Sequence, residues 1–451
     1  MTDRTAAPEP LTTDAVRRHV AALAPDALPA FVHDLAALRT HAAAVRTALP
    51  GRVELYYAAK ANPDAPLLTA LRDAVDGYEV SSGGELAHVR AAVPDAPLAF
   101  GGPGKTPAEI LAAVDAGVHR WHVESEQELH RLAAVLAGPR PEASVDVLLR
   151  VNLPVGAGAL DTVALAMGGR PTPFGLDPDR AEACVRLLTD PLGPFGPLRG
   201  RLRLRGVHAH LASGLAAAEH LAVAGQVVGW AARLAERHAF PLDEVNVGGG
   251  MAVDYADPAA RFDWTAFGEG LAELLDRHPG PVLRIEPGRA LTAYCGWYAT
   301  EVLDVKQSHG EDFAVVRGGT HHLRTPATRG HDQPFGVLPV DAWPHPWPRP
   351  AVTTGRATLA GQLCTPKDVL ARSAGAAAGL RTADRVLFAM AGAYGWNISH
   401  HDFLMHPRPG FHYLAPEPGA AGAASPGDTP DDAPTGPDRS GIEKRSSPGG
   451  V

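Results

Sequence analysis

The chain has 451 residues, of which 45% are hydrophobic, and a formal net charge of -9 at pH 7. This length predicts two domains plus tails. The acidic balance, with no block rich in Lys or Arg, argues against nucleic acid or an anionic membrane as a partner. The cysteines (Cys184, Cys295 and Cys364) lack metal-ligand spacing, so no metal site is predicted and reduced thiols are expected. The start at Met1 resembles no signal peptide, and no apolar span has membrane length, which favours a cytoplasmic protein.

The first 290 residues show an alternation of strands and helices. Residues 1–29 are expected to form an N-terminal arm with one helix at 14–23, followed by a strand at 30–34 and a helix to residue 49. Further strands are expected at residues 53–59, 77–80, 98–101, 120–123, 145–151, 204–210, 244–247 and 282–285. Helical segments such as 85–92 and 217–238 separate them. This pattern predicts an α/β fold with a (β/α)₈ TIM barrel at residues 30–290, with a doubly wound open sheet as the alternative.

The pattern changes after residue 291. Segments typical of strands, joined by connections rich in Pro and Gly, occur at residues 302–305, 313–316, 351–360 and 385–388. We expect a mostly β domain at residues 291–415, which the strand near Phe31 could join because it is not one of the barrel's eight. Residues 416–451 are mainly Pro, Gly, Ala, Ser and Asp, which predicts a disordered tail.

Lys60 ends the first strand of the alternation and is followed directly by Ala61, Asn62 and Pro63. A lysine among apolar neighbours is desolvated, which favours the neutral amine and allows attack on an aldehyde. That is the chemistry of a pyridoxal phosphate Schiff base. The alternative is a lysine that only extends its ammonium group to water.

Other polar or glycine-rich groups also follow strands, at the end of a barrel where functional residues gather. They are Glu79 and Glu85 after the second strand, His208, His210 and Ser213 at the sixth, Gly248, Gly249 and Gly250 after the seventh, and Glu286 and Arg289 after the eighth. Glycines directly after a strand let backbone N–H groups approach a phosphate. The two histidines alternate along a strand, so only one is expected to face the barrel mouth, and a zinc pair would need further ligands. The alternatives are a flexible turn for the glycines, a packed core histidine, and a structural salt bridge from Glu286 to Arg289.

Taken together, these motifs resemble the fold type III pyridoxal phosphate-dependent decarboxylases, the group of the diaminopimelate, ornithine and arginine decarboxylases. The resemblance covers about residues 30–414 and includes Cys364 in Gly-Gln-Leu-Cys and Tyr394 in Gly-Ala-Tyr-Gly. It implies an alanine-racemase-like barrel with a β domain. It also implies a head-to-tail homodimer with shared active sites. The alternatives for Cys364 and Tyr394 are a buried thiol and a packed turn residue.

The resemblance also implies a role for each cofactor-binding position. Lys60 matches the Schiff-base lysine, His210 the histidine that stacks on the ring, and Glu286 the partner of the pyridine nitrogen. Residues that match phosphate contacts are Ser213, Gly248, Gly249, Gly250 and Arg289, the last of which is a phosphate or substrate contact. Tyr394 matches the tyrosine of the family motif.

Further positions concern the reaction and the acidic side of the ring. Glu79 and Glu85 match the acidic positions behind the ring. Cys364 matches the cysteine that a neighbouring subunit supplies. In the implied reaction the substrate amine displaces Lys60, CO₂ is lost, and Cys364 or a water that it positions protonates the α-carbon.

Departures from the family indicate the substrate. Relatives that act on diamino acids carry Asp or Glu directly after the cysteine, where this chain has Thr365, and many carry Gly where it has Ala212. Without the carboxylate, a cationic distal group loses a bond of about 1.5–3 kcal/mol. Ornithine, lysine and diaminopimelate are therefore unfavoured substrates.

Two basic stretches of the β domain favour an anionic distal group. The first contains His321, His322, Arg324, Arg329 and His331, and the second is the segment 396–403. A solvated basic loop is the alternative. Both stretches resemble the siderophore-pathway decarboxylases of the staphyloferrin B type, which act on a citryl-diaminopropionate conjugate. Diaminopimelate decarboxylase of lysine synthesis and an inactive regulatory homologue that binds partners remain the alternatives.

Overall fold

The computed structural model describes residues 11–118, 120–154, 165–166 and 168–415. The predicted tail at 416–451 and the first ten residues of the predicted arm lie outside these ranges. Within them, no helix is long and apolar enough to cross a membrane.

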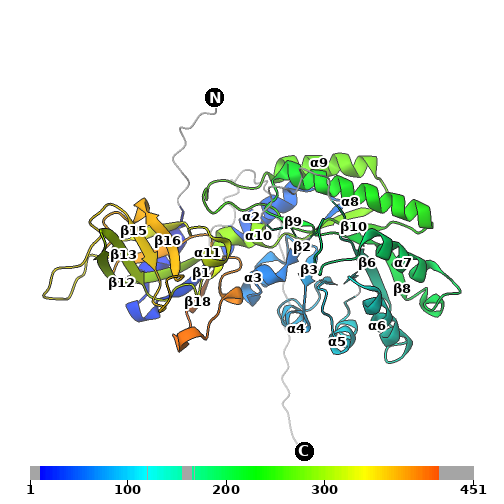
Figure 1. The fold of residues 1–451 in the computed structure, drawn as a ribbon, viewed down its shortest axis with the longest axis horizontal. Coiled ribbons are helices and arrows are strands. Elements are labelled where there is room, and N and C mark those ends of the chain that lie inside the picture. The colour runs from blue at the N-terminus through cyan, green and yellow to red at the C-terminus, as the bar shows by residue number, and fades with distance from the viewer. Residues whose placement is uncertain (1–10, 119, 155–164, 167, 416–451) are drawn as a thin grey trace, which may run out of the picture. The chain divides into compact units, whose positions relative to one another are not determined.

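Eight parallel strands form a closed barrel in the order β10-β11-β2-β3-β4-β5-β6-β8 (Figure 1). They are β2 (Val53–Ala58), β3 (Gly77–Val80), β4 (Leu98–Phe100), β5 (Arg120–Val123), β6 (Val145–Arg150), β8 (Leu202–His208), β10 (Glu244–Asn246) and β11 (Val282–Ile285). Four of these strands, β3, β4, β6 and β10, are buried along their whole length, which explains why they are short apolar runs rather than alternating ones. The barrel confirms the predicted fold class and excludes the open sheet.

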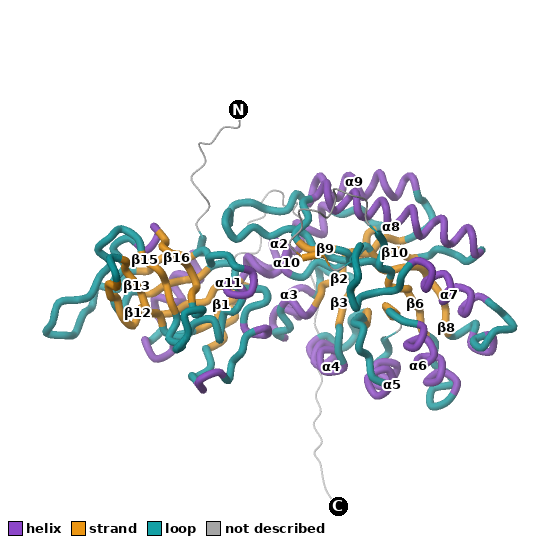
Figure 2. The backbone as a smooth tube through the Cα atoms, in the orientation of Figure 1, coloured by secondary structure: helices purple, strands orange, loops and turns teal. Residues whose placement is uncertain are grey.

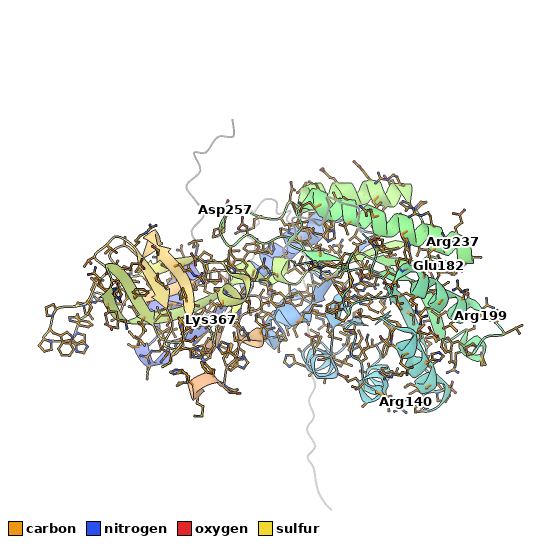
Figure 3. The ribbon with its side chains drawn as sticks, in the orientation of Figure 1. Arg140, Glu182, Arg199, Arg237, Asp257 and Lys367 are labelled. Carbon is orange, nitrogen blue, oxygen red and sulfur yellow. The ribbon has the colours of Figure 1, made fainter. Side chains whose placement is uncertain are left out.

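Helices cover the outside of the barrel, and Figure 2 shows them around the strands. They are α2 (Leu35–Ala48), α3 (Ala65–Leu71), α4 (Gly83–Ala92), α5 (Pro107–Asp115), α6 (Glu126–Ala137), α7 (Pro178–Thr189), α8 (Ala217–His238) and α9 (Trp264–Arg277). Several begin at side chains that cap the free N–H groups, such as Ser82 for α4 and Ser125 for α6. On the outer surface, Arg237 of α8 forms an ion pair with Glu182 of α7 (Figure 3).

A second sheet of eight strands follows the barrel. It contains β1 (Ala30–Asp34), β12 (Gly296–Ser308), β13 (Glu311–Val316), β14 (Phe335–Leu338), β15 (Ala357–Ala360), β16 (Val369–Ala374), β17 (Arg385–Phe388) and β18 (Gly410–Leu414). The early strand β1 pairs with β12 and β18 and thus belongs to this sheet. The strand predicted at 351–360 is wrong in its first part, because only Ala357–Ala360 is a strand and Ala351 forms a single bridge. The domain limits at residues 29, 290 and 415 stay predictions.

The remaining α-helices and strands are short. They are α1 (Asp14–Ala22), α10 (Arg289–Thr292), α11 (Thr325–Arg329), and the paired strands β7 (Leu165–Ala166) and β9 (Ala212–Ser213). Arg385 of β17 donates to the carbonyls of Val20 and Leu23 at the end of α1. The N-terminal helix is therefore anchored to the second sheet.

Candidate active site

A cavity of about 490 Å³ lies at the carboxyl ends of the barrel strands, the end at which barrels carry their functional groups. Its lining includes Lys60, Glu79, Ser81, Arg150, His208, His210, Ser213, Gly249, Gly250, Glu286, Arg289, Arg329 and Tyr394. These residues follow different barrel strands or come from the second sheet's loops. The closed barrel therefore brings together most of the cofactor-binding residues that the sequence predicts.

Lys60 lies in a 3₁₀ turn (Ala59–Ala61) directly after β2. Its Nζ is 2.6 Å from Oε2 of Glu79, at the end of the neighbouring strand β3. Burial acts to lower the pKa of Lys60, but Glu79, Tyr394 and Glu286 together outweigh burial, and the net pKa is raised. The prediction of a neutral amine is therefore wrong for the cofactor-free chain, because no local sequence pattern indicates that Glu79 pairs with Lys60.

Glu79 and Glu85 lie close together beside this lysine. The hydroxyl of Ser81 donates to Glu79 over 2.7 Å, and the Ser81 N–H donates to Glu85 over 2.7 Å. Burial, followed by repulsion from Glu79, raises the pKa of Glu85 to about 7. Ser81 therefore holds two carboxyl groups at defined positions, and their place behind the ring stays a prediction.

Glu286 also lines the cavity and is buried among polar groups of three strands. Its Oε1 accepts a bond of 2.7 Å from Asn246 Nδ2, and its carboxylate lies 3.6 Å from His122 Nε2 and 3.4 Å from His208 Nε2. The two imidazole rings stack, with centroids 4.0 Å apart. Burial and nearby positive groups lower the pKa of both histidines well below the usual value, so both are neutral near pH 7. The salt bridge from Glu286 to Arg289, the alternative role for Glu286, does not form among the described residues.

His122, His208 and Glu286 also place three potential ligand atoms within 4.8 Å of one another. The sequence suggested no further ligands around His208, because His122 was not identified and Glu286 was assigned to the pyridine nitrogen. The prediction that the protein has no metal is untested by this geometry.

His210 lies just beyond β8, which ends at His208 rather than at residue 210 as predicted. Both histidines therefore reach the cavity, and the expectation that only one faces it is wrong. The N–H of Gly249 donates to Nδ1 of His210 over 3.1 Å, which requires that this nitrogen be unprotonated. Burial likewise lowers the pKa of His210 well below the usual value.

The glycines after β10 allow two loops to approach closely. A Cβ on Gly249 would lie 2.2 Å from the carbonyl oxygen of Glu286. Gly248 and Gly250 have φ angles of +71° and +96°, which disfavour side chains. Gly249 and Gly250 line the cavity with Ser213, whereas Gly248 packs against His210.

Tyr394 brings the second part of the chain to the cavity. Its N–H donates to the carbonyl of Ala61 over 2.7 Å, and the guanidinium carbon of Arg289 lies 4.5 Å from its ring centre. Arg289 also donates to the hydroxyl of Tyr255 over 2.8 Å. The cavity is therefore built by both parts of the chain.

The predicted catalytic and substrate-binding residues that do not line this cavity all belong to the second part of the chain, and they are Cys364, Thr365, His321, His322 and Arg324. Cys364 is exposed. His321 and His322 are buried, and Nδ1 of His322 lies 2.9 Å from the hydroxyl of Tyr298. Their roles at a site stay predictions.

Four cavity or cluster residues were missed in the sequence: His122, Asn246, Arg150 and Arg329, the last noted only as part of a basic stretch. Arg150 pairs with Glu124 over 2.6 Å. His122, Asn246 and Arg150 all lie on barrel strands near the carboxyl end, and that position is the one signal that could have identified them.

Comparison with known proteins decides the family. Residues 35–293 match the family described as pyridoxal-dependent decarboxylase, pyridoxal binding domain. The chain belongs to the pyridoxal-dependent decarboxylases. It is therefore a pyridoxal phosphate-dependent carboxy-lyase, as the sequence predicted.

Decarboxylases of other bacteria are similar in sequence to this chain. A Staphylococcus aureus enzyme named 2-[(L-alanin-3-ylcarbamoyl)methyl]-2-hydroxybutanedioate decarboxylase is 39% identical over 388 residues, which cover 85% of this chain and 93% of that protein. The diaminopimelate decarboxylase of Pseudomonas aeruginosa is 30% identical over 377 residues, which cover 82% of this chain and 84% of that protein.

Solved structures of decarboxylases share the fold. The diaminopimelate decarboxylase of Helicobacter pylori, complexed with L-lysine, matches with a TM-score of 0.75 and 20% identity, covering 89% of this chain and 94% of that one. A lysine decarboxylase of Selenomonas ruminantium matches with a TM-score of 0.71 and 21% identity, and the match covers 90% of this chain and 97% of that one.

The cavity suits pyridoxal phosphate by the chemistry of its donors. It offers one lysine amine for an aldehyde, a buried carboxylate at Glu286 for a pyridine nitrogen, and a glycine-lined segment beside Ser213 for a phosphate. All three kinds of donor line one cavity. The donor set therefore fits the cofactor of the family.

Proposed function

We propose that this protein removes the α-carboxylate of an amino-acid conjugate whose distal end is anionic, of the citryl-diaminopropionate type. The observation that carries the proposal is the 39% identity over 85% of the chain to the S. aureus enzyme named for such a conjugate. Thr365 supports it, because a threonine offers no charge to a distal ammonium group.

The chain's own residues have distinct roles in this proposal. Lys60 would hold the cofactor aldehyde, and His210 would lie against the ring. Glu286 would keep a proton at the pyridine nitrogen, and Ser213 with the neighbouring glycines would bind the phosphate. When bound, pyridoxal phosphate supplies a ring that accepts the electrons left by loss of CO₂.

The proton for the α-carbon would come from Cys364, or from a water that it positions, on a second copy of the chain. Cys364 is exposed and lies outside the cavity of its own chain, in agreement with a role toward a neighbour. We therefore propose a homodimer with shared sites. Mixing inactive Lys60→Ala and Cys364→Ala chains should restore about a quarter of the activity, because half of the dimers are mixed and each mixed dimer carries one intact site. No recovery after exchange of subunits would contradict the sharing.

The substrate is tested by mass spectrometry of reactions with the purified, cofactor-loaded protein. Citryl-diaminopropionate, diaminopimelate and ornithine are offered separately, and loss of CO₂ is followed for each. We expect turnover of the citryl conjugate and little of the two others. Turnover of diaminopimelate alone would assign the protein to lysine synthesis, and no turnover of any amino acid, with cofactor bound, would support a binding role.

Two variants sharpen this test. Lys60→Ala should abolish both turnover and the visible absorbance of the lysine-linked cofactor, and an unchanged spectrum would refute the role of Lys60. Thr365→Asp should improve kcat/KM for diaminopimelate by about 10- to 150-fold, the value of one charge-assisted bond.

A further inference from the structure

The short turn that carries Lys60 is bonded to a segment far away in the chain, residues 392–397. Asn397 Nδ2 donates to the Lys60 carbonyl over 2.7 Å, and the N–H of Tyr394 donates to the carbonyl of Ala61 over 2.7 Å. The last carbonyls of a helix have no partner within it, and this turn is a single 3₁₀ turn of three residues. The distant segment therefore supplies partners that the turn itself does not have.

A third bond holds the same two segments together without touching Lys60. Nδ2 of the buried Asn62 donates to the carbonyl of Gly392 over 3.0 Å. The chain is tightly packed at Gly392, because a Cβ added there would lie 2.0 Å from the carbonyl oxygen of Thr292. The bonds made by Asn62 and Tyr394 therefore keep the two segments in contact even when the bond from Asn397 is removed.

The position of Asn397 is fixed by its own turn. It lies in the 3₁₀ turn Trp396–Ile398, and the ring of Trp396 stacks on His401 with ring centres 3.6 Å apart. The side chain of Asn397 is exposed and does not line the cavity. It thus acts on Lys60 from outside the cavity, through the backbone carbonyl alone.

We propose that Asn397 is a positioning residue for Lys60, because a fixed carbonyl direction sets the direction in which the Lys60 side chain enters the cavity. A carbonyl only accepts hydrogen bonds, so this contact needs the amide group of Asn397, and a carboxylate in its place would repel the carbonyl. Water can satisfy the same carbonyl but does not fix its direction. This role rests on the proposed function, in which Lys60 holds the cofactor aldehyde, and it does not depend on the substrate.

The test compares two probes in the full, cofactor-free chain. Pyridoxal phosphate carries the aldehyde that reacts with a lysine, whereas pyridoxine phosphate has an alcohol in its place and binds without reacting. Stopped-flow absorbance gives the rate at which the lysine-linked cofactor forms, and calorimetry gives the affinity for pyridoxine phosphate. The variants are Asn397→Ala, Asn397→Asp and Asn397→Gln, with Thr47→Ala as the matched control. Thr47 is exposed on α2, outside the cavity, and its hydroxyl donates to the carbonyl of Ala43 over 2.9 Å.

Asn397→Ala and Asn397→Asp should slow the formation of the lysine-linked cofactor about 10- to 100-fold, the effect of a small misplacement of a reacting group. Their affinity for pyridoxine phosphate and their midpoint of urea unfolding should stay close to those of the natural protein, because an exposed side chain contributes little to stability. Asn397→Gln keeps an amide donor on a longer side chain and should recover part of the rate. Thr47→Ala should match the natural protein in all three measurements.

Natural rates in both Asn397→Ala and Asn397→Asp would overturn the positioning role. An equal loss of rate and of pyridoxine phosphate affinity would also overturn it, because the whole cavity would then be disturbed. Lys60→Ala separates this role from the function on which it rests. If Lys60→Ala keeps the visible absorbance, the proposed role of Lys60 fails and the positioning role fails with it. Slow formation in Asn397→Ala without turnover of the citryl conjugate supports the positioning role and refutes the substrate proposal alone.

Discussion

Gly250 offers a direct test of the glycine-lined part of the cavity. It has a φ of +96°, and a Cβ added there would lie 2.2 Å from the carbonyl oxygen of Ala212. The Gly250 carbonyl also accepts bonds from the N–H groups of Gly214 and Leu215, at 2.8 and 2.9 Å. The unfavourable backbone conformation costs about 1–3 kcal/mol, and forcing two packed backbone segments apart costs about 1–3 kcal/mol more. Gly250→Ala should therefore lower the free energy of unfolding by about 2–6 kcal/mol.

Gly225 provides the matched control, because it lies within α8 and a Cβ added there would have no atom within 4 Å. Gly225→Ala should raise stability by about 0.5–1 kcal/mol, since alanine favours a helix more than glycine does. Urea unfolding of both cofactor-free variants gives the stabilities, and equilibrium titration with pyridoxal phosphate gives the affinities. We expect Gly250→Ala to lose affinity and Gly225→Ala to keep it. Natural stability together with natural cofactor affinity in Gly250→Ala would refute this account of the loop.

Three further predictions concern charge. Glu286→Gln should lower kcat about 100- to 1,000-fold in steady-state assays, because the amide cannot stabilise a positive charge at the pyridine nitrogen. His33, buried and with a pKa lowered by burial to about 4, should make the protein less stable as pH falls from about 6.5 to 4, by up to about 3 kcal/mol in urea unfolding, and His33→Gln should reduce this slope. The raised pKa of Lys60 stabilises the folded chain below the unfolded value near 10.4, and that contribution is lost as pH rises through the folded value. Glu79→Gln should therefore let Lys60 of the cofactor-free protein react with aldehydes at lower pH, as measured by reductive trapping.

Much of the fold followed from the sequence because buried parallel strands are continuous apolar runs. The strands β3, β5 and β11 have the predicted ends. The strand β8 begins and ends two residues before the predicted range. Its first two residues are Leu202 and Arg203, and the Arg203 side chain pairs with Asp146 on the neighbouring strand β6. The strand β18 was missed because its partner β1 lies far away in the chain, and such pairing has no local signal.

The candidate site was predictable where local motifs mark it and hidden where it depends on distant strands. Lys60, Glu286 and the glycines carry motifs, and the structure brings them to one cavity. The contact of His122 with Glu286 depends on β5 and β11, which are not paired with each other and are brought together only when the barrel closes. The charge of Lys60 was mispredicted for the same reason, because Glu79 pairs with it across neighbouring strands.

The distribution of charge in the cavity suggests how a substrate with unlike ends is oriented. The carboxylates of Glu79 and Glu286 lie at the barrel, the first beside Lys60 and the second beside the buried histidines. The arginines Arg289 and Arg329 lie near Tyr255, without carboxylate partners among the described residues. Under the proposed function, an amino group is attracted to the carboxylates and an anionic distal end to the arginines. The reverse orientation would place like charges together at both ends, so selection for an anionic distal end and positioning of the α-carbon near Lys60 follow from one electrostatic arrangement.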